Sequence, residues 1–186
     1  MCRMEHTMET KSNERDALRR RAILEAAYAC FLQFGYARTS LDDIAKRAHI
    51  SRPLIYTRFK SKEDILAAVF EHIFEQRYPA VEQALAAPGR KREKLLNIYE
   101  ILLLEPWEEG IGSPMGVELY EVCLQLLPLQ EKAYTQRCLQ YTQAILGEQE
   151  LSEVFMLAID GLQSDIPTTD VLRRRLQILI EHFAGE

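Results

Sequence analysis

Residues 40–66 read SLDDIAKRAHISRPLIYTRFKSKEDIL and contain two short helical patterns with a tight turn between them. The apolar residues of the first pattern follow the i, i+3, i+4, i+7 spacing of one helix face. They are Leu41, Ile44, Ala45 and Ala48. In the second pattern Pro53 lies in the first turn, where it costs no hydrogen bond, and Ile55 and Phe59 are one turn apart. Two short helices joined in this way predict a helix-turn-helix at residues 40–59.

The second helix of this motif is apolar on one side only, so its other side is free to face a partner. That side combines guanidinium and hydroxyl donors with apolar surface that suits a thymine methyl group. Its members are Arg52, Pro53, Leu54, Tyr56, Thr57 and Arg58. Hydroxyl groups and cations suited to phosphate contacts surround it. These are Thr39, Ser40, Lys46, Arg47, Ser51, Lys60 and Lys62. The pattern predicts a surface that reads the major groove of duplex DNA, and the alternative for each cation is an ordinary solvated side chain.

The charge of the chain is divided unevenly between its two ends. Residues 1–62 carry 13 Lys and Arg against 7 Asp and Glu, a net charge of +6. Residues 63–186 carry 10 against 21, a net charge of −11, so the whole chain has a net charge of −5. This division predicts an N-terminal part that meets a polyanion and a C-terminal part that does not.

The rest of the sequence has helical periodicity and no strand alternation, so we predict an all-α protein. A first helix covers residues 15–34 and ends at Gly35, and a long helix from residue 62 is bent or ended by Pro79. The apolar stripe of the first helix is Leu18, Ile23, Ala26, Ala27, Cys30, Phe31 and Phe34. The later helices are predicted at 91–105, stopped by Pro106, and, after a loop at 108–114, at 115–127, 129–147, 153–164 behind a Ser152 cap, and from 169 onward.

Two C-terminal helices carry apolar surface that needs a partner. Residues 153–164 are apolar on every side, and the last helix has apolar residues at steps of four, three and four, which is the spacing of a seam for another helix. The predicted dimer interface consists of Phe155, Ile159, Leu172, Leu176, Leu179 and Phe183. The alternative is that this seam packs only within its own chain.

Other functional classes lack their motifs. No apolar run is long enough to cross a bilayer, and residues 1–14 lack the apolar segment of a secretory signal, so we expect a cytoplasmic protein. The four cysteines have no C-x-x-C spacing and are expected to be reduced core thiols, with a redox sensor as the alternative. The histidines form no metal-binding pattern, and neither a nucleotide-binding loop nor a serine elbow is present. We therefore expect no metal, no cofactor and no enzymatic activity.

The segment 40–66 resembles the DNA-binding segment of TetR/AcrR-type regulators, through its S-R-P-x-x-Y-x-x-F arrangement and the K-S-K-E-D start of the next helix. The likeness extends over residues 18–74. His49 departs from the glycine that is usual there, although histidine tolerates a left-handed turn better than most residues. The resemblance implies base contacts from Arg52, Leu54 and Thr57 and DNA-backbone contacts from Thr39, Tyr56 and Lys62.

We divide the chain into a disordered tail at 1–14, a helix-turn-helix domain at 15–61 and an effector-binding and dimerisation domain at 62–186. The resemblance implies a repressor that binds a palindromic operator as a homodimer and releases it when a small, largely apolar effector binds. The side chains that could line an effector cavity, or else be plain core residues, are Tyr99, Leu103, Trp107, Met115, Tyr120, Cys123, Tyr141 and Met156. The alternative is a ligand-independent DNA-binding regulator with a filled C-terminal core, controlled by a protein partner.

Overall fold

The computed structural model describes residues 2–185, with side chains described from residue 15 onward, and every regular element in that range is a helix. The elements are α1 (Cys2–Phe34), α2 (Leu41–Arg47), α3 (Arg52–Tyr56), α4 (Lys62–Glu75), α5 (Tyr78–Ala86), α6 (Lys91–Tyr99), the π-helix η1 (Glu100–Leu104), α7 (Glu105–Ile111), α8 (Gly116–Leu126), α9 (Pro128–Leu146), α10 (Gln149–Gln163) and α11 (Thr169–Ala184). The predicted all-α class is confirmed.

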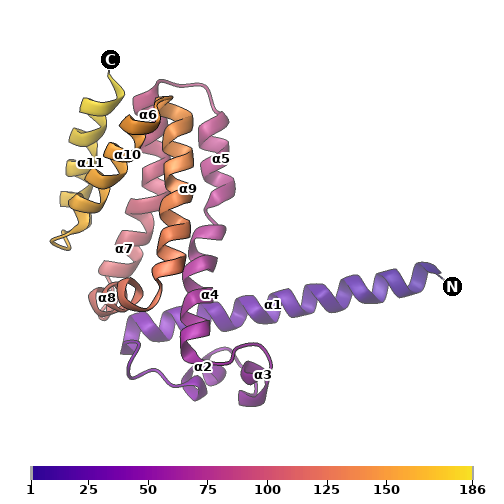
Figure 1. Cartoon of the computed structure of the whole chain (residues 1–186). Helices are drawn as coiled ribbons and strands as arrows, with labels where there is room; N and C mark the ends of the chain where they lie inside the picture. The colour runs from indigo at the N-terminus through magenta and orange to yellow at the C-terminus, as the bar shows by residue number, and fades with distance from the viewer. Residues whose placement is uncertain (1, 186) are drawn as a thin grey trace.

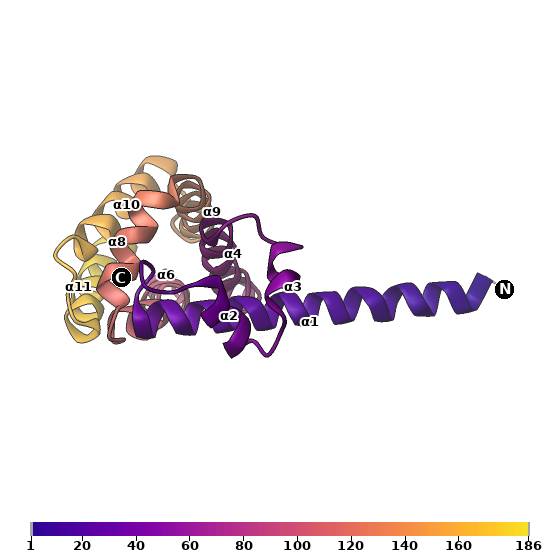
Figure 2. The ribbon, with the colours of Figure 1, turned by 90° about the horizontal axis from the view of Figure 1, so that it is seen from below.

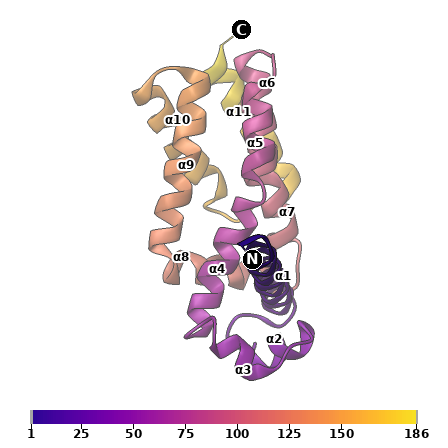
Figure 3. The same ribbon diagram turned by 90° about the vertical axis from the view of Figure 1, so that its right-hand side faces the viewer.

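Helix α4 joins the two parts of the molecule. α1 crosses the lower part, with α2 and α3 beneath it, and the C-terminal helices stand above it (Figure 1). A view turned by a quarter shows α2 and α3 at the same end (Figure 3). α4 packs against α1 and also against α9 of the upper bundle. The helix-turn-helix therefore lies at one end of a helical body.

A first hydrophobic core lies where α1, α2, α3 and α4 meet. Its fully buried members include Ile23, Ala27, Phe31, Ile44, Ile55 and Ile65. The predicted stripe of α1 is confirmed between Ile23 and Phe31 but is wrong at its ends, because Leu18 is 66% exposed and Phe34 is 46% exposed. The neighbouring helices cover α1 only between about Ile23 and Phe31, in its C-terminal third, which periodicity alone does not reveal.

We expected residues 1–14 to be a disordered tail, but residues 2–14 are helical. Residues 2–14 continue α1, which extends away from the other helices (Figure 1). This segment contains neither proline nor glycine and is rich in Glu, Lys, Arg and Met, which have high helix propensity. Residue 1 lies outside the described part of the chain.

The helix starts agree only partly with the predicted caps. Ser40 caps α2, because its Oγ accepts from the N–H of Asp43 at 3.2 Å while the Asp43 carboxylate accepts from the N–H of Ser40 at 3.0 Å. Ser51 has the extended backbone of an N-cap, but within the described residues its side chain caps no amide. Ser152 lies inside α10, which begins at Gln149, and its Oγ donates to a main-chain carbonyl one turn earlier.

Two turns around the motif require a left-handed backbone. Gly35 has φ of +86° directly after α1, and a Cβ at this position would overlap the carboxylate of Glu118. His49 has φ of +54° in the turn between α2 and α3, as expected for the position where the resemblance places glycine.

Pro106 does not stop its helix, contrary to the prediction. The chain passes from α6 through η1 into α7, so most of the segment expected to be a loop at 108–114 is helical. A proline at 106 has no N–H to donate to the carbonyl of Leu102, four residues earlier. Tyr134 of α9 satisfies that carbonyl, because its hydroxyl donates to it at 2.8 Å. A tertiary hydrogen bond and a π turn thus allow the helix to continue past a proline.

Replacing Tyr134 with Phe should lower the free energy of unfolding by about 1–3 kcal/mol, because the Leu102 carbonyl would lose its donor in a partly buried position. Tyr141→Phe is the matched control, since the Tyr141 hydroxyl donates to the side chain of Glu82 at a longer 3.5 Å and to no main-chain carbonyl among the described residues. Urea denaturation of both variants measures the difference. Equal stability of the two variants would contradict this account of Pro106.

The second core, in the C-terminal bundle, corrects the predicted dimer interface. Phe155, Ile159, Leu172 and Leu176 are at most 4% exposed within their own chain, and Leu179 and Phe183 pack against the same core. α11 packs against α6 and α10, so the seam is filled by intrachain neighbours. The spacing of apolar residues predicts that a helix covers the seam but does not say which helix.

Candidate nucleic-acid interface and ligand cavity

One face of α3 carries the most accessible part of the predicted DNA-reading surface. Arg52, Pro53, Tyr56 and Thr57 are exposed, whereas Ile55 points into the core. Viewed from below, α2 and α3 lie in front of α1 (Figure 2). These four side chains are therefore accessible at the end of the molecule that carries α2 and α3.

Arg52 is held in place before any partner binds. Its guanidinium donates to the carboxylate of Asp42 at 3.0 Å and to the hydroxyl of Tyr56 at 3.2 Å, and lies 5.6 Å from the centre of the Tyr56 ring. Both side chains are exposed, so the pair is orientated without being removed from solvent. A preorganised guanidinium of this kind can make a bidentate contact with a guanine edge.

Other predicted members of this face have their polar groups engaged. Arg58 turns toward α1, where it forms an ion pair with Asp16 at 2.6 Å and is only 21% exposed. Thr57 is exposed, but its hydroxyl donates to the carbonyl of Leu54 at 2.7 Å. Leu54 itself is half-buried. The prediction for Arg58 is corrected, because this side chain ties the end of the motif to the first helix.

The turn before α2 uses two residues that were expected to contact phosphates. Thr39 is 2% exposed, and its hydroxyl donates to the carbonyl of Gly35 at 2.7 Å, so its predicted phosphate contact is corrected. Lys62 donates from Nζ to the carbonyls of Tyr36 at 2.6 Å and Thr39 at 3.0 Å, and burial lowers its pKa. A phosphate contact from Lys62 would have to replace these bonds. Both residues fasten the turn to the start of α4.

Replacing Lys62 with Met should lower the free energy of unfolding by about 1–3 kcal/mol, because the carbonyls of the turn would lose a charged donor. The matched control is Lys60→Met, since the Lys60 side chain is exposed. Thermal or urea unfolding of the two variants gives the comparison. A Lys62 variant as stable as the Lys60 variant would show that the ammonium is not needed to hold the turn.

The remaining predicted phosphate groups are accessible. Ser40, Lys46, Ser51 and Lys60 are exposed around α2 and α3. Arg38, which we did not select, is also exposed in the turn that leads into α2. Arg38 lies outside the helical pattern of the sequence, and only the folded turn brings it beside the motif.

A cavity of about 440 Å³ lies between the two parts of the molecule. Six of the eight side chains expected to line an effector cavity do line it: Tyr99, Leu103, Trp107, Tyr120, Cys123 and Met156. The other two do not. Met115 donates its N–H to the carbonyl of Leu32 in α1, and Tyr141 packs against Tyr78 on another side of the bundle. The cavity has the size of typical small-molecule sites.

The lining that sequence reasoning missed comes from two sources. Tyr28 of α1 and Phe70, Ile73 and Phe74 of α4 belong to the N-terminal part of the chain, where we looked only for DNA contacts. Glu131 of α9 and Asp160 of α10 are acidic residues, whereas the sequence predicted only apolar or amphipathic lining side chains. Only the packing of α4 against α9 brings these groups to one place.

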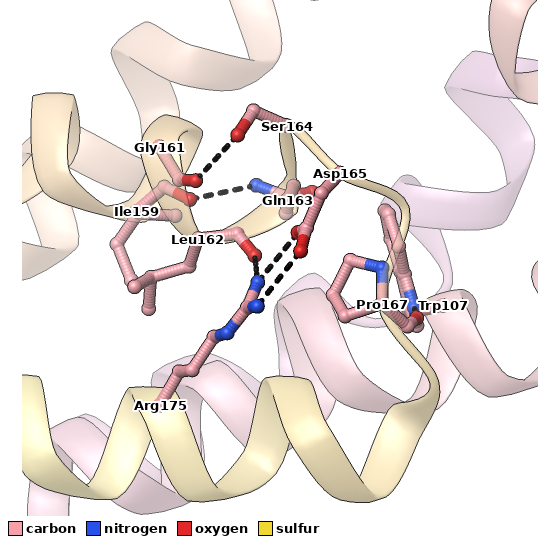
Figure 4. A network of polar contacts seen from close by, with 9 residues as sticks. All are labelled: Trp107, Ile159, Gly161, Leu162, Gln163, Ser164, Asp165, Pro167 and Arg175. Atoms are coloured by element: carbon pink, nitrogen blue, oxygen red, sulfur yellow. Dashed lines mark hydrogen bonds and ion pairs between the residues drawn. The ribbon is translucent and has the colours of Figure 1, made fainter.

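Trp107 is fixed in the cavity wall by the loop between α10 and α11. Its Nε1 donates to the carbonyl of Pro167 at 2.9 Å, and the indole is 5% exposed. Arg175 of α11 holds the same loop, through two bonds to Asp165 at 2.6 and 2.8 Å and one to the carbonyl of Leu162 at 3.0 Å (Figure 4). The indole therefore has a defined position beside any bound molecule.

The cysteines near this cavity are protonated thiols. Burial raises the pKa of Cys123 and of Cys138 to about 12, and nearby carboxylates add to the shift. Cys30 is also buried, and its pKa is raised. Because the thiolate is the reactive form, these environments favour the core assignment over a redox sensor.

The comparisons with known proteins agree with this architecture. The sequence model described as "Bacterial regulatory proteins, tetR family" matches residues 23–69. This N-terminal part of the chain is similar to the TetR family of bacterial regulators. The TetR match extends past the predicted domain boundary at residue 61, and Ile65 and Leu66 of α4 belong to the first core. The division of the chain at that residue remains a prediction.

The curated relatives that the chain matches are regulators of transcription. The chain is 37% identical over 67 residues to the HTH-type regulator YhgD of Bacillus subtilis, covering 36% of this chain and 35% of the relative. It is 35% identical over 120 residues to the transcriptional activator FasR of Mycolicibacterium smegmatis, covering 64% and 55%. The chain thus spans between about a third and just over half of these relatives. They are regulators and not enzymes, in agreement with the prediction.

The fold of the chain also matches solved structures over nearly its full length. A TetR-like regulator from Rhodococcus sp. RHA1 is 24% identical with a TM-score of 0.66, and covers 91% of this chain and 98% of its own. A TetR regulator from Haloarcula marismortui has a TM-score of 0.74 at 17% identity, covering 90% and 97%. Among the described residues, no helix is both long and apolar enough to cross a membrane.

Proposed function

We propose that this chain is a cytoplasmic DNA-binding transcriptional repressor whose α3 enters the major groove. The observation that carries the proposal is the preorganised pair of Arg52 and Tyr56 on an exposed helix face, set in the basic end of an otherwise acidic chain. Exposed Lys46 and Lys60 flank this face and suit the phosphates on either side of the groove. The TetR match over residues 23–69 supports the same assignment.

The DNA contact is tested with a duplex selected from a random-sequence library by the unaltered protein. The double variant Arg52→Ala/Tyr56→Ala should lose at least about a hundredfold in affinity for that duplex, since each base contact is worth about 1–3 kcal/mol. Arg174→Ala, an exposed cation on α11, is the charge-matched control for Arg52. Circular dichroism should show the same helical content in all three proteins, and retention of full affinity by the double variant would refute the groove assignment.

A homodimer would place two such helices on a palindromic operator, one in each half-site. The residues proposed for its interface are those that the chain leaves exposed on α10 and α11: Val154, Leu157, Val171 and Ile178, which are 38–71% exposed. Both helices lie on the side of the body away from the projecting start of α1 (Figure 1). Gly161 lies one turn from Leu157, and open space around it allows close approach of a partner helix.

The dimer is tested by placing a charge on this surface. Leu157→Glu should convert the protein to monomers at micromolar concentration, because the carboxylate would be buried without a partner in the interface. Leu129→Glu is the control, since Leu129 is 76% exposed at the start of α9. Sedimentation velocity distinguishes the outcomes, and an unchanged dimer of the Leu157 variant would exclude this face.

The cavity supports control by a small, largely apolar effector. Tyr28 and Phe74 bring α1 and α4 into its wall, so a molecule that fills it pushes on the helices that carry the DNA-reading motif. The far end of α4 is anchored by Arg77, which donates to the carbonyl of Ile73 at 2.7 Å and to Glu109 of α7 at 2.8 Å. A shift of α4 would change the separation of the two α3 helices in a dimer. The open cavity favours control by a small effector over a ligand-independent regulator with a filled C-terminal core.

A further inference from the structure

The cavity has a charge pattern that an apolar effector alone does not explain. Glu131 and Asp160 line it, and among the described lining residues there is no Lys, Arg or His. Within residues 15–185, neither carboxylate has a hydrogen bond or an ion pair. Burial, with a contribution from Asp160, raises the pKa of Glu131, and burial raises the pKa of Asp160. The wall thus holds two acidic groups without a counterion among the side chains of residues 15–185.

Aromatic rings occupy much of the remaining wall. Six elements contribute rings, from α1 and α4 through α6, α7 and α8 to α9. Tyr120 lies near both carboxylates, since Glu131 and Asp160 each add to the rise of its pKa after burial. Trp107 packs edge-on against Tyr120, with 5.3 Å between the ring centres. The negative faces of aromatic rings attract a cation, as the carboxylates do.

The opening of the cavity has the same character. Thr135, Met156 and Asp160 line both the cavity and a shallow groove on the outside of α9 and α10. Asp160 is exposed, which places it at this opening, whereas Lys132 and Glu153 lie only in the outer groove. A carboxylate at the opening of an apolar cavity raises the local concentration of cations and lowers that of anions.

We propose that the cavity binds an organic cation with an apolar, preferably aromatic body, whose charge lies between Glu131 and Asp160 and against the neighbouring rings. The proposal rests on the proposed function, because it specifies the class of effector for the same cavity. An anionic ligand such as a fatty acid would add a third negative charge beside two that have no counterion. A neutral ligand would cover the half-buried carboxylate of Glu131 without giving it a partner. A tertiary or quaternary ammonium group removes both penalties.

The experiment uses three probes of nearly equal shape. They are dibenzyldimethylammonium, its neutral isostere with a quaternary carbon in place of the nitrogen, and the anion dibenzylacetate. Trp107 is the sole tryptophan of the chain and lies in the cavity wall, so its emission reports binding without DNA. We expect a dissociation constant for the cation at least about tenfold below that for the neutral isostere, and no binding of the anion at the same concentrations.

Substituting the two carboxylates tests whether the preference for the cation over the neutral isostere arises in this cavity. Glu131→Gln and Asp160→Asn should each weaken binding of the cation by about tenfold and leave binding of the neutral isostere within about twofold. Glu121→Gln is the control, because it removes the same charge from an exposed position on α8 outside the lining. Isosteric amides preserve shape, and thermal unfolding verifies that each variant is folded.

Three results would overturn the proposal. These are equal or tighter binding of the neutral isostere, tighter binding of dibenzylacetate, and no change in Trp107 emission with any of the three probes. Because emission is measured without DNA, failure here is separate from failure of the DNA-binding proposal, which the Arg52/Tyr56 variant tests. Adding the cation to the complex with the selected duplex then shows whether occupancy releases DNA.

Discussion

Helix α4 packs in the first core along most of its length and also contacts α9 of the C-terminal bundle, and the position of the DNA-reading motif depends on both contacts. Ile65 and Leu66, near its start, pack among α1, α2 and α3. Phe74, near its end, lies against Tyr134 of α9 with 4.1 Å between the ring centres, in the wall of the cavity. The two contacts are about two turns apart on one rigid helix, so packing at the upper end constrains the lower end. Because α4 takes part in both the cavity wall and the first core, a movement at the cavity can be passed to the helix-turn-helix.

The basic end of the molecule divides its cations between folding and surface exposure. Lys62 donates to main-chain carbonyls of the turn before α2, and Arg58 forms an ion pair with Asp16 of α1. Arg52, Lys46 and Lys60 remain exposed around α2 and α3. The net charge of the segment therefore overstates the number of groups that can meet a phosphate. Internal cations fix the angle at which the exposed ones are presented.

Two large aromatic side chains of the cavity wall are held in place by specific hydrogen bonds. The Tyr134 hydroxyl donates to the carbonyl of Leu102, which Pro106 leaves without a main-chain donor. The Trp107 Nε1 donates to the carbonyl of Pro167. Each ring is thus fixed at the wall by a hydrogen bond at its polar end. Full collapse of the space would break these bonds and bury Glu131 and Asp160 more deeply, which is unfavourable for unpaired carboxylates.

Much of this protein follows from local sequence. The helical periodicity, the turn at His49 and the capping box of Ser40 depend on residues within one or two turns, so the all-α class and the helix-turn-helix could be predicted directly. Six cavity residues could also be selected as apolar or amphipathic side chains. Only the tertiary structure decided that the seam of α11 is filled by its own chain, that a helix continues past Pro106, and that two carboxylates meet in the cavity. These outcomes depend on which helices lie side by side, and a periodic pattern records that a face is covered without recording its neighbour.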